Sequence, residues 1–260
     1  MTSVIGSQAR FDVLAGFIQL NRSVAIVADA GNDCLRAVNL ETGQTSRYAG
    51  RCTVRGDSDG ELVSEARFNT PWSVVLHKYN LYITDTNNNA IKVIKEGHDH
   101  VVTVAQGGVI RSPTGITVDQ FSSNDIAYIT TTDGLLKLDL NIRTATKLTD
   151  RTAVPGPLSA IRSSPLVGLS DLAFVTDTIL IIADNYKNQL IVADLARDKV
   201  TYICDGKPGT ANGDIKTCGL NRPISVLAMS WSIYIGERGF IRRLPLKAIQ
   251  GFIQPADAIG

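Results

Sequence analysis

The sequence lacks a long apolar segment and has almost no net charge. In 260 residues, 26 Lys and Arg offset 25 Asp and Glu, which leaves a formal charge of +1. No stretch reaches the ~18 apolar residues of a membrane-spanning helix, and no charged-then-apolar leader follows Met1. A near-neutral total also gives no broad positive field for a phosphate backbone, although a one-sided basic face can hide within it. Membrane spanning and general nucleic-acid binding are therefore poor explanations of this chain.

Residues that carry catalytic chemistry are also scarce. The chain has three histidines, His77, His98 and His100, and they are too close in sequence to come from several repeats. A zinc site needs three or four converging ligands. There is no G-x-S-x-G motif, and no Cys or Ser has an evident His partner. The sequence therefore predicts no catalytic residue and no metal ligand.

The chain does contain a sequence motif that occurs three times. It reads V-A-D-A-G-N-D-C-L-R at 27–36, I-T-D-T-N-N-N-A-I-K at 83–92 and I-A-D-N-Y-K-N-Q-L-I at 182–191. Each copy is an apolar strand, an Asp, a turn and a second strand. We call the Asp the marker; degenerate copies have Thr131 and Glu237 in its place. A period of roughly 40–50 residues with four short strands is typical of a propeller blade.

The segments between the markers are short, apolar and β-rich, bounded by Asn, Asp and Gly, and helical periodicity is poor. Continuous apolar runs are predicted to be inner strands buried on both faces, and alternating runs to be outer strands. The predicted fold is all-β: a single β-propeller domain over 1–260, built of four-stranded antiparallel blades. We count five blades, and six would require a missing one.

The two ends of the chain suggest how the propeller closes. The last copy has predicted strands at 224–230, 232–236 and 240–244 but only a weak fourth. Segment 2–6 lies where an outer strand belongs, just ahead of the first Ala-Arg-Phe. We therefore predict that the N-terminal strand joins the last blade, because that closure removes an exposed sheet edge.

The second copy resembles the NHL-repeat β-propellers, whose phrase is roughly D-G-x-x-x-x-A-x-F-x-x-P-x-x-V followed by Y-V-x-D-x-x-N-x-x-I-R. The first copy matches well, and the third and fifth depart most. The resemblance implies a propeller but leaves function open, since such propellers include protein binders, RNA binders and a few enzymes. The matching residues of the second copy are Asp59, Gly60, Ala66, Phe68, Pro71, Val74, Tyr82, Asp85, Asn88, Ile91 and Lys92.

The marker has a plain structural interpretation. An Asp that closes a strand and an Asn three residues on can bond the N–H groups of the tight turn between them. A metal site from Asp29 and Asn32 is the alternative. Similar propeller architectures include calcium lactonases, so a channel calcium site stays open; no other cofactor is expected. Its candidate ligands near the inner-strand starts are Asp12, Asn69, Asp171 and Asn221.

The four cysteines form two plausible pairs. Cys34 opens a third strand and Cys52 follows the neighbouring fourth strand at 45–49, so the two can meet within disulfide range. Cys204 and Cys218 bracket the Gly-rich loop 205–217. Two disulfides would indicate an oxidising, extracellular or secreted location; four free thiols in a cytoplasmic protein is the alternative. The Asn21 sequon is a glycosylation candidate that agrees with secretion.

Two long loops, 51–65 and 204–222, are the predicted contact surfaces, because loops on rigid scaffolds commonly carry binding. Arg55-Gly56-Asp57-Ser58 also reads as an adhesion tetrapeptide, although the Gly/Asp chemistry of the repeat explains it as well. Residues directly after a leading Pro are expected near the channel mouth. The candidate binding residues are Arg51, Arg55, Asp57 and Lys207 in the loops, and Trp72, Thr114 and Ile224 after the prolines.

The sequence favours a non-catalytic interaction module that presents blade loops to a protein or glycan partner. The first alternative is a hydrolase or lyase of the metal-dependent propeller type, working in the channel. The second is an RNA-binding NHL domain, which would need exposed aromatic side chains over a positive surface. Trp72, Tyr48 and Trp231 are the available aromatics, and Trp231 is expected in the core.

Overall fold

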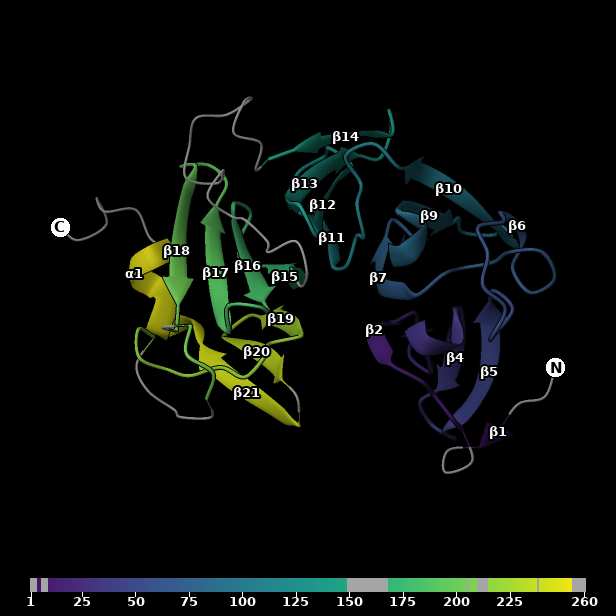
Figure 1. Ribbon diagram of the computed structural model, residues 1–260, viewed down its shortest axis with the longest axis horizontal. Coiled ribbons are helices and arrows are strands. Elements are labelled where there is room, and N and C mark those ends of the chain that lie inside the picture. Colours follow the sequence, from purple (N-terminus) through teal and green to yellow (C-terminus); the bar gives the residue numbers. More distant parts are fainter. Residues whose placement is uncertain are drawn as a thin grey trace. The chain divides into compact units, whose positions relative to one another are not determined.

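The computed structural model describes residues 4–5, 9–148, 168–204, 206–209, 215–237 and 239–253. It divides into two compact units, each of which is described by itself. The first unit comprises 1–118, 125–127 and 138–145, and the second comprises 119–124, 128–137 and 146–260. Figure 1 shows the chain coloured along the sequence, with each strand labelled.

The first unit contains two five-stranded antiparallel sheets. In the first, the order is β1-β5-β4-β3-β2, and in the second it is β6-β10-β9-β8-β7. The 3₁₀ turn η2 (Ala30–Asn32) joins β3 to β4, and the 3₁₀ turn η3 (Thr86–Asn88) joins β8 to β9. The strands are β1 (Val4–Ile5), β2 (Leu14–Gln19), β3 (Val24–Asp29), β4 (Cys34–Asn39), β5 (Gln44–Ala49), β6 (Gly60–Glu61), β7 (Pro71–His77), β8 (Asn80–Asp85), β9 (Ala90–Ile94) and β10 (His100–Gln106).

Three further sheets follow along the chain, in the orders β11-β12-β13-β14, β15-β16-β17-β18 and β19-β20-β21. Among the described residues of this part, helix is confined to η5 (Leu246–Ile249) and α1 (Gln250–Ile253), and none of the helices that the structure describes is long and apolar enough to cross a membrane. The strands are β11 (Ile116–Val118), β12 (Ile126–Thr131), β13 (Gly134–Asp139), β14 (Thr144–Lys147), β15 (Leu169–Phe174), β16 (Ile179–Asp184), β17 (Gln189–Asp194), β18 (Lys199–Ile203), β19 (Ser225–Met229), β20 (Ser232–Glu237) and β21 (Phe240–Pro245).

The repeat that was read from the sequence corresponds to the sheets one for one. If the short strands β1 and β6 are left out of the count, every marker is the last residue of the second strand of its sheet. Every marker residue is buried. The fold class is confirmed: the protein is an all-β propeller with five blades, each an antiparallel sheet. The five markers are Asp29 on β3, Asp85 on β8, Thr131 on β12, Asp184 on β16 and Glu237 on β20.

Complete burial on both faces is found in middle strands of the second and fourth blades, not in the innermost strands as the apolar runs suggested. Strands β9, β16 and β17 are buried at every residue, whereas the first strands β2 and β7 are partly exposed. A middle strand has neighbours on both edges and core on both faces, so it tolerates no polar alternation. In the first unit the core includes Ile26, Phe68 and Ile83, each fully buried.

The predicted closure by the N-terminal strand is wrong. Val4 and Ile5 pair with Thr45 and Gln44 of β5, at the outer edge of the first blade. The repeat explains this position, because β6 adds to the outer edge of β10 in the second blade in the same way. Both short strands lie a few residues ahead of an Ala-Arg-Phe sequence, at Ala9 and at Ala66. The N-terminal strand is therefore the first blade's copy of β6, and in the described residues the fifth sheet has three strands.

Candidate functional site

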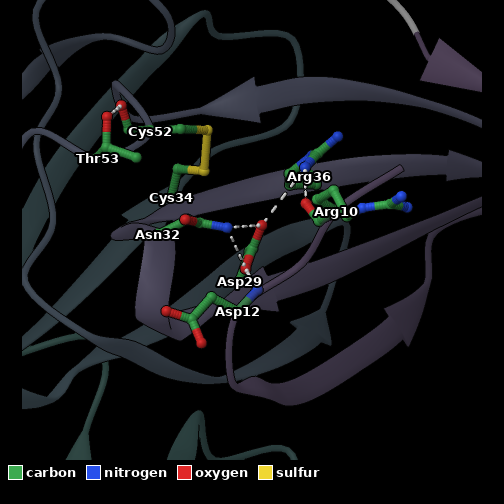
Figure 2. Close-up of a disulfide and its surroundings, with 8 residues drawn as sticks. All are labelled: Arg10, Asp12, Asp29, Asn32, Cys34, Arg36, Cys52 and Thr53. Carbon is green, nitrogen blue, oxygen red and sulfur yellow. Dashed lines mark hydrogen bonds and ion pairs between the residues drawn. A yellow bond between two sulfur atoms is a disulfide. The ribbon is translucent and has the colours of Figure 1, made fainter. Parts of the chain in front are cut away.

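In the first two blades, the asparagine three residues after the marker donates to the marker carboxylate. Figure 2 shows Asn32 donating from Nδ2 to both carboxylate oxygens of Asp29, at 3.0 and 2.9 Å. Asn88 makes the same bond to Asp85, at 2.8 Å. The expectation that the marker bonds the N–H groups of its own turn is confirmed in the third and fourth blades, where the Asp133 N–H donates to Thr131 Oγ1 at 3.2 Å and the Lys187 N–H donates to Asp184 at 2.9 Å.

The marker also fixes the loop that enters its own blade. The Asp12 amide donates to Asp29 at 2.8 Å and the Asn69 amide donates to Asp85 at 2.8 Å. In the last blade, the Asn221 amide donates to Glu237 at 2.6 Å. A buried carboxylate is stable only when such donors surround it, so the markers of the first, second and fifth blades are structural residues that tie the entry loop to the strand that the marker ends.

The residue four positions after the marker makes a second bond, to the next blade of the chain. Asp33, Asn89 and Asn188 occupy this position with φ of 56°, 52° and 53°, which Asp and Asn tolerate better than most residues. Their side-chain oxygens accept the amide N–H of the following blade's entry loop, at 2.8–3.0 Å. The donors are Thr70, Ser112 and Arg222 respectively.

The loop between β5 and β7, residues 50–70, is anchored at its start by the predicted disulfide. Cys34 and Cys52 are bonded, with Cα atoms 4.9 Å apart, and Figure 2 shows the bridge beside the Asn32–Asp29 pair. The Thr53 amide donates to the Asn32 carbonyl at 2.7 Å. Gly50 has φ +80°, and a Cβ there would lie 2.7 Å from the buried Phe68 ring. Only glycine fits this conformation and this space without strain.

The middle of loop 50–70 is anchored by Lys92, a lysine on β9 that is fully buried. Its Nζ lies 2.9 Å from Asp59 Oδ1 and 3.1 Å from Asp57 Oδ1. Asp59 also accepts the Thr103 amide at 2.7 Å, and Asp57 accepts Gln106 Nε2. A buried ammonium must be paired, so this lysine binds the tip of the loop to two strands of the second blade.

The pKa values of two carboxyl groups near Lys92, those of Asp85 and Asp59, are shifted in opposite directions. Burial raises the pKa of Asp85 to about 7, and the donors Asn69 and Asn88 offset this only in part. Burial also raises the pKa of Asp59, but the bonds from Thr103 and Lys92 outweigh it and leave that pKa below its usual value. The Asp59 carboxylate therefore remains ionised around neutral pH and pairs with Lys92.

On this anchored frame, loop 50–70 presents charged side chains to solvent. Arg51, Arg55 and Asp57 are all exposed. Arg55 Nε lies 3.0 Å from the buried carboxylate of Asp33, yet 67% of the Arg55 side chain remains accessible. Asp57 is 40% accessible although it is bonded to Lys92. Both charged residues of the adhesion tetrapeptide, Arg55 and Asp57, therefore form ion pairs with blade residues. This agrees with the interpretation that the Gly/Asp chemistry of the repeat explains the tetrapeptide.

Beside this loop lies a smaller basic feature. Arg36 on β4 donates to the Arg10 carbonyl at 2.9 Å and lies 3.5 Å from Asp29 Oδ2 (Figure 2). Its guanidinium stacks over the Phe11 ring at 4.8 Å, an attraction between a cation and a π face. Arg36 is thus a structural residue of β4 that holds the first blade's entry loop through Arg10 and Phe11.

The other predicted binding residues are spread over both units. In the first unit, Trp72 and Thr114 are half-buried, and the Thr114 carbonyl accepts Thr84 Oγ1 at 2.6 Å. In the second unit, Lys207 and Ile224 are exposed. The structure describes each unit separately, so it tests no site that combines the two sets.

The remaining sequence expectations have mixed outcomes. Cys204 and Cys218 are bonded, as predicted. Asn21 is exposed, and its Oδ1 accepts two turn amides. Trp231 is 65% exposed, so its expected place in the core is wrong; it lies in the two-residue turn between β19 and β20, where a side chain meets solvent.

The histidines and the candidate calcium ligands have local roles. His77 Nε2 lies 2.8 Å from Asp125 Oδ1, and the bonds from His77 and Lys78 lower the pKa of Asp125 to about 2. His98 and His100 are exposed near the β9–β10 turn. Asp171 accepts the Val226 amide at 3.0 Å. Within the described ranges, no three His, Cys, Asp or Glu side chains are grouped to hold a metal ion.

Comparisons with known proteins agree with the fold. No protein-family model matches the chain, and no curated protein matches it. A chain of a nidogen/laminin complex matches with TM-score 0.61 and 14% identity, over 91% of this chain and 77% of that one. A virginiamycin B lyase from Staphylococcus aureus matches with TM-score 0.54 and 12% identity, over 94% and 87%.

An auxiliary nutrient binding protein from Bacteroides ovatus matches with TM-score 0.68 and 13% identity. The match covers 90% of this chain and 56% of that one, so the chain spans little more than half of that protein. At such identities the likeness shows the fold alone, because one fold hosts many functions.

Sequence reasoning missed Lys92 as the anchor of the loop. A signal was present: Ala90-Ile91-Lys92-Val93-Ile94 places one lysine inside an apolar strand, and a lysine is almost never fully buried unless it is paired. The acidic pair Asp57 and Asp59 supplied the partner. The bond from the fourth residue after the marker was also missed, because the sequence does not show which amide lies opposite that side chain.

Proposed function

We propose that this protein is a non-catalytic interaction module of the NHL-repeat type, acting outside the cell, that binds a protein or glycan partner through loop 50–70. The observation that carries the proposal is the anchoring of this exposed loop. A disulfide, a buried lysine and an ion pair hold its backbone, while Arg51, Arg55 and Asp57 stay accessible.

Rigidity is what makes this loop suited to binding. A flexible loop loses conformational entropy when a partner orders it, and a loop that is already fixed avoids much of that loss. The fixed charges also favour a partner with complementary charge and reject others. The second unit's disulfide and the exposed Asn21 sequon are consistent with an oxidising compartment.

The structural relatives support a binding role without deciding it. Their names include a nidogen/laminin complex and an auxiliary nutrient binding protein. They also include lyases, and an enzyme remains the competing hypothesis. No observation on the described residues favours catalysis or RNA binding over binding by the anchored loop.

The test uses unreduced protein immobilised at one end and exposed to extracellular-matrix extract, followed by affinity measurement with the purified captured component. We expect Arg51→Glu to weaken that affinity at least about tenfold. The matched control is Arg22→Glu, the same charge change at an exposed arginine in the β2–β3 turn. Equal affinities for the two variants would refute binding through loop 50–70.

A further inference from the structure

The fifth sheet ends on a strand whose outer edge is open among the described residues. Its order is β19-β20-β21, whereas the fourth sheet of the same unit continues to a fourth strand, β18. Figure 1 shows β21 and β18 in the second unit. A strand edge exposes unpaired N–H and C=O groups that can template another strand.

The register of the β20–β21 hairpin identifies which groups are open. Ser232 pairs with Pro245, and the Leu246 amide donates to the Trp231 carbonyl at 3.0 Å. Antiparallel ladders alternate, so every second residue of β21 turns its amide toward β20. The residues that turn it outward are Ile241, Arg243 and Pro245. Pro245, which has no N–H, is tolerated because it lies at such an outward position.

A cavity of about 730 Å³ runs beside this edge. All six residues of β21 line it, together with apolar side chains from the fourth blade and its following loop, among them Leu190, Ile203 and Leu220. This volume is within the range of sites that hold ligands. The wall is fixed, because the Cys204–Cys218 disulfide also lines the cavity.

The two faces of β21 differ in chemistry. Arg242 lies on the same face of the sheet as Ile235, its pairing partner, and its Nε lies 2.8 Å from Glu237 Oε1. On the other face Ile241 is 80% exposed, and Arg243 is exposed with no ion pair to any residue in the described ranges. A strand added at the edge would therefore place alternate side chains against an apolar wall and the others beside Ile241 and Arg243.

We propose that the open edge of β21 is a second binding site, which takes an extended amphipathic acidic segment of a partner protein as an antiparallel fourth strand. Main-chain bonds to Ile241 and Arg243 supply affinity, as in other cases of strand addition. Apolar side chains at every second position fill the cavity. A carboxylate between them pairs with Arg243, which gives the site its preference for acidic segments.

The test measures fluorescence anisotropy of a labelled, end-capped peptide, Thr-Val-Asp-Val-Asp-Val-Thr, against the full unreduced chain. We expect saturable binding that Ile241→Pro weakens at least about tenfold, because proline removes an outward donor without touching the β20 ladder. Ile241→Thr, which keeps the donor and the β-branch, is the matched control and should change affinity less than about threefold.

A charge exchange tests the site without proline. Arg243→Glu should lose the acidic peptide and gain the matching peptide with Lys in place of Asp; thermal melts establish that each variant is folded. Absence of saturable binding by the acidic peptide, or equal binding by the Arg243→Glu variant, would overturn the proposal. So would a dimer that Ile241→Pro dissociates, because that result would assign the edge to a second copy of this chain.

Discussion

Substitution of Lys92 by methionine tests whether the loop 50–70 depends on one buried charge. The Nζ atom is within 2.9 and 3.1 Å of two carboxylates and has no solvent exposure. Methionine keeps most of the buried side-chain volume and removes the charge. The change therefore isolates the electrostatic anchor from the packing of β9.

The expected loss follows from the exposure of the partners. Removing one member of a fully buried ion pair typically destabilises by ~3–5 kcal/mol, because the remaining charge stays unsolvated. Here Asp57 and Asp59 are 40% and 41% exposed, so water can reach them after the lysine is gone. We therefore expect a loss of about 1–3 kcal/mol, between the buried and the surface values.

The assay is urea unfolding at pH 7, with Lys147→Met as the matched control. Lys147 pairs with Asp133 at 3.4 Å, but both side chains are partly exposed, so its loss should be about 0–1 kcal/mol. A double-mutant cycle of Lys92→Met with Asp59→Asn should give a coupling energy of at least about 1 kcal/mol. If Lys92→Met is no more destabilising than the control, or the coupling is zero, the loop is not held by this charge.

Three further outcomes are expected. Replacing Cys34 and Cys52 by alanine removes a disulfide that links residues 18 positions apart. This change should lower the free energy of unfolding by about 3 kcal/mol, and an unchanged denaturation midpoint without reductant would contradict it. In Gly50→Ala, the new Cβ would sit on a backbone with φ +80° and lie 2.7 Å from the Phe68 ring. Thermal melting should therefore show a loss of stability of about 1–3 kcal/mol, and an unchanged melting temperature would count against this geometry. Burial raises the pKa of both Asp171 and Asp85 to about 7. The folded protein therefore binds protons more tightly than the unfolded chain, and these groups reduce stability as pH rises from about 4 to 7, each by at most ~1.4 kcal/mol per pH unit. Asp171→Asn should flatten that fall in urea titrations at pH 4 to 7; an unchanged slope would show that this carboxyl does not titrate there.

Much of the architecture could be predicted because each repeat contains its own strand and turn residues, close together in the sequence. The marker occurs at the end of the second strand in all five blades; in four of them it is a carboxylate, which at a buried strand end must be surrounded by hydrogen-bond donors. The Cys34–Cys52 pair was also predictable, because antiparallel neighbours place the start of one strand beside the end of the other. Such inferences need only strand order and turn length.

The errors arose where two placements satisfy the same local pattern. Segment 2–6 can add to any open outer edge, and its choice of β5 is a tertiary pairing that the segment's own residues do not specify. Burial of whole strands likewise depends on the neighbours on both faces, which periodicity alone does not reveal.

The amino-acid sequence by itself determined the blade repeat, the five-fold count, the markers and both disulfides, because each depends on residues close in the chain or in one sheet. Tertiary structure alone decided that Lys92 is paired to a loop more than thirty residues away and that Asp33 and Asn188 bond the next entry loop. It also decided that, among the described residues, no strand pairs with the outer edge of β21. The physical reason is that a side chain's partner across the fold is set by packing, and no spacing along the chain encodes which group will lie opposite it.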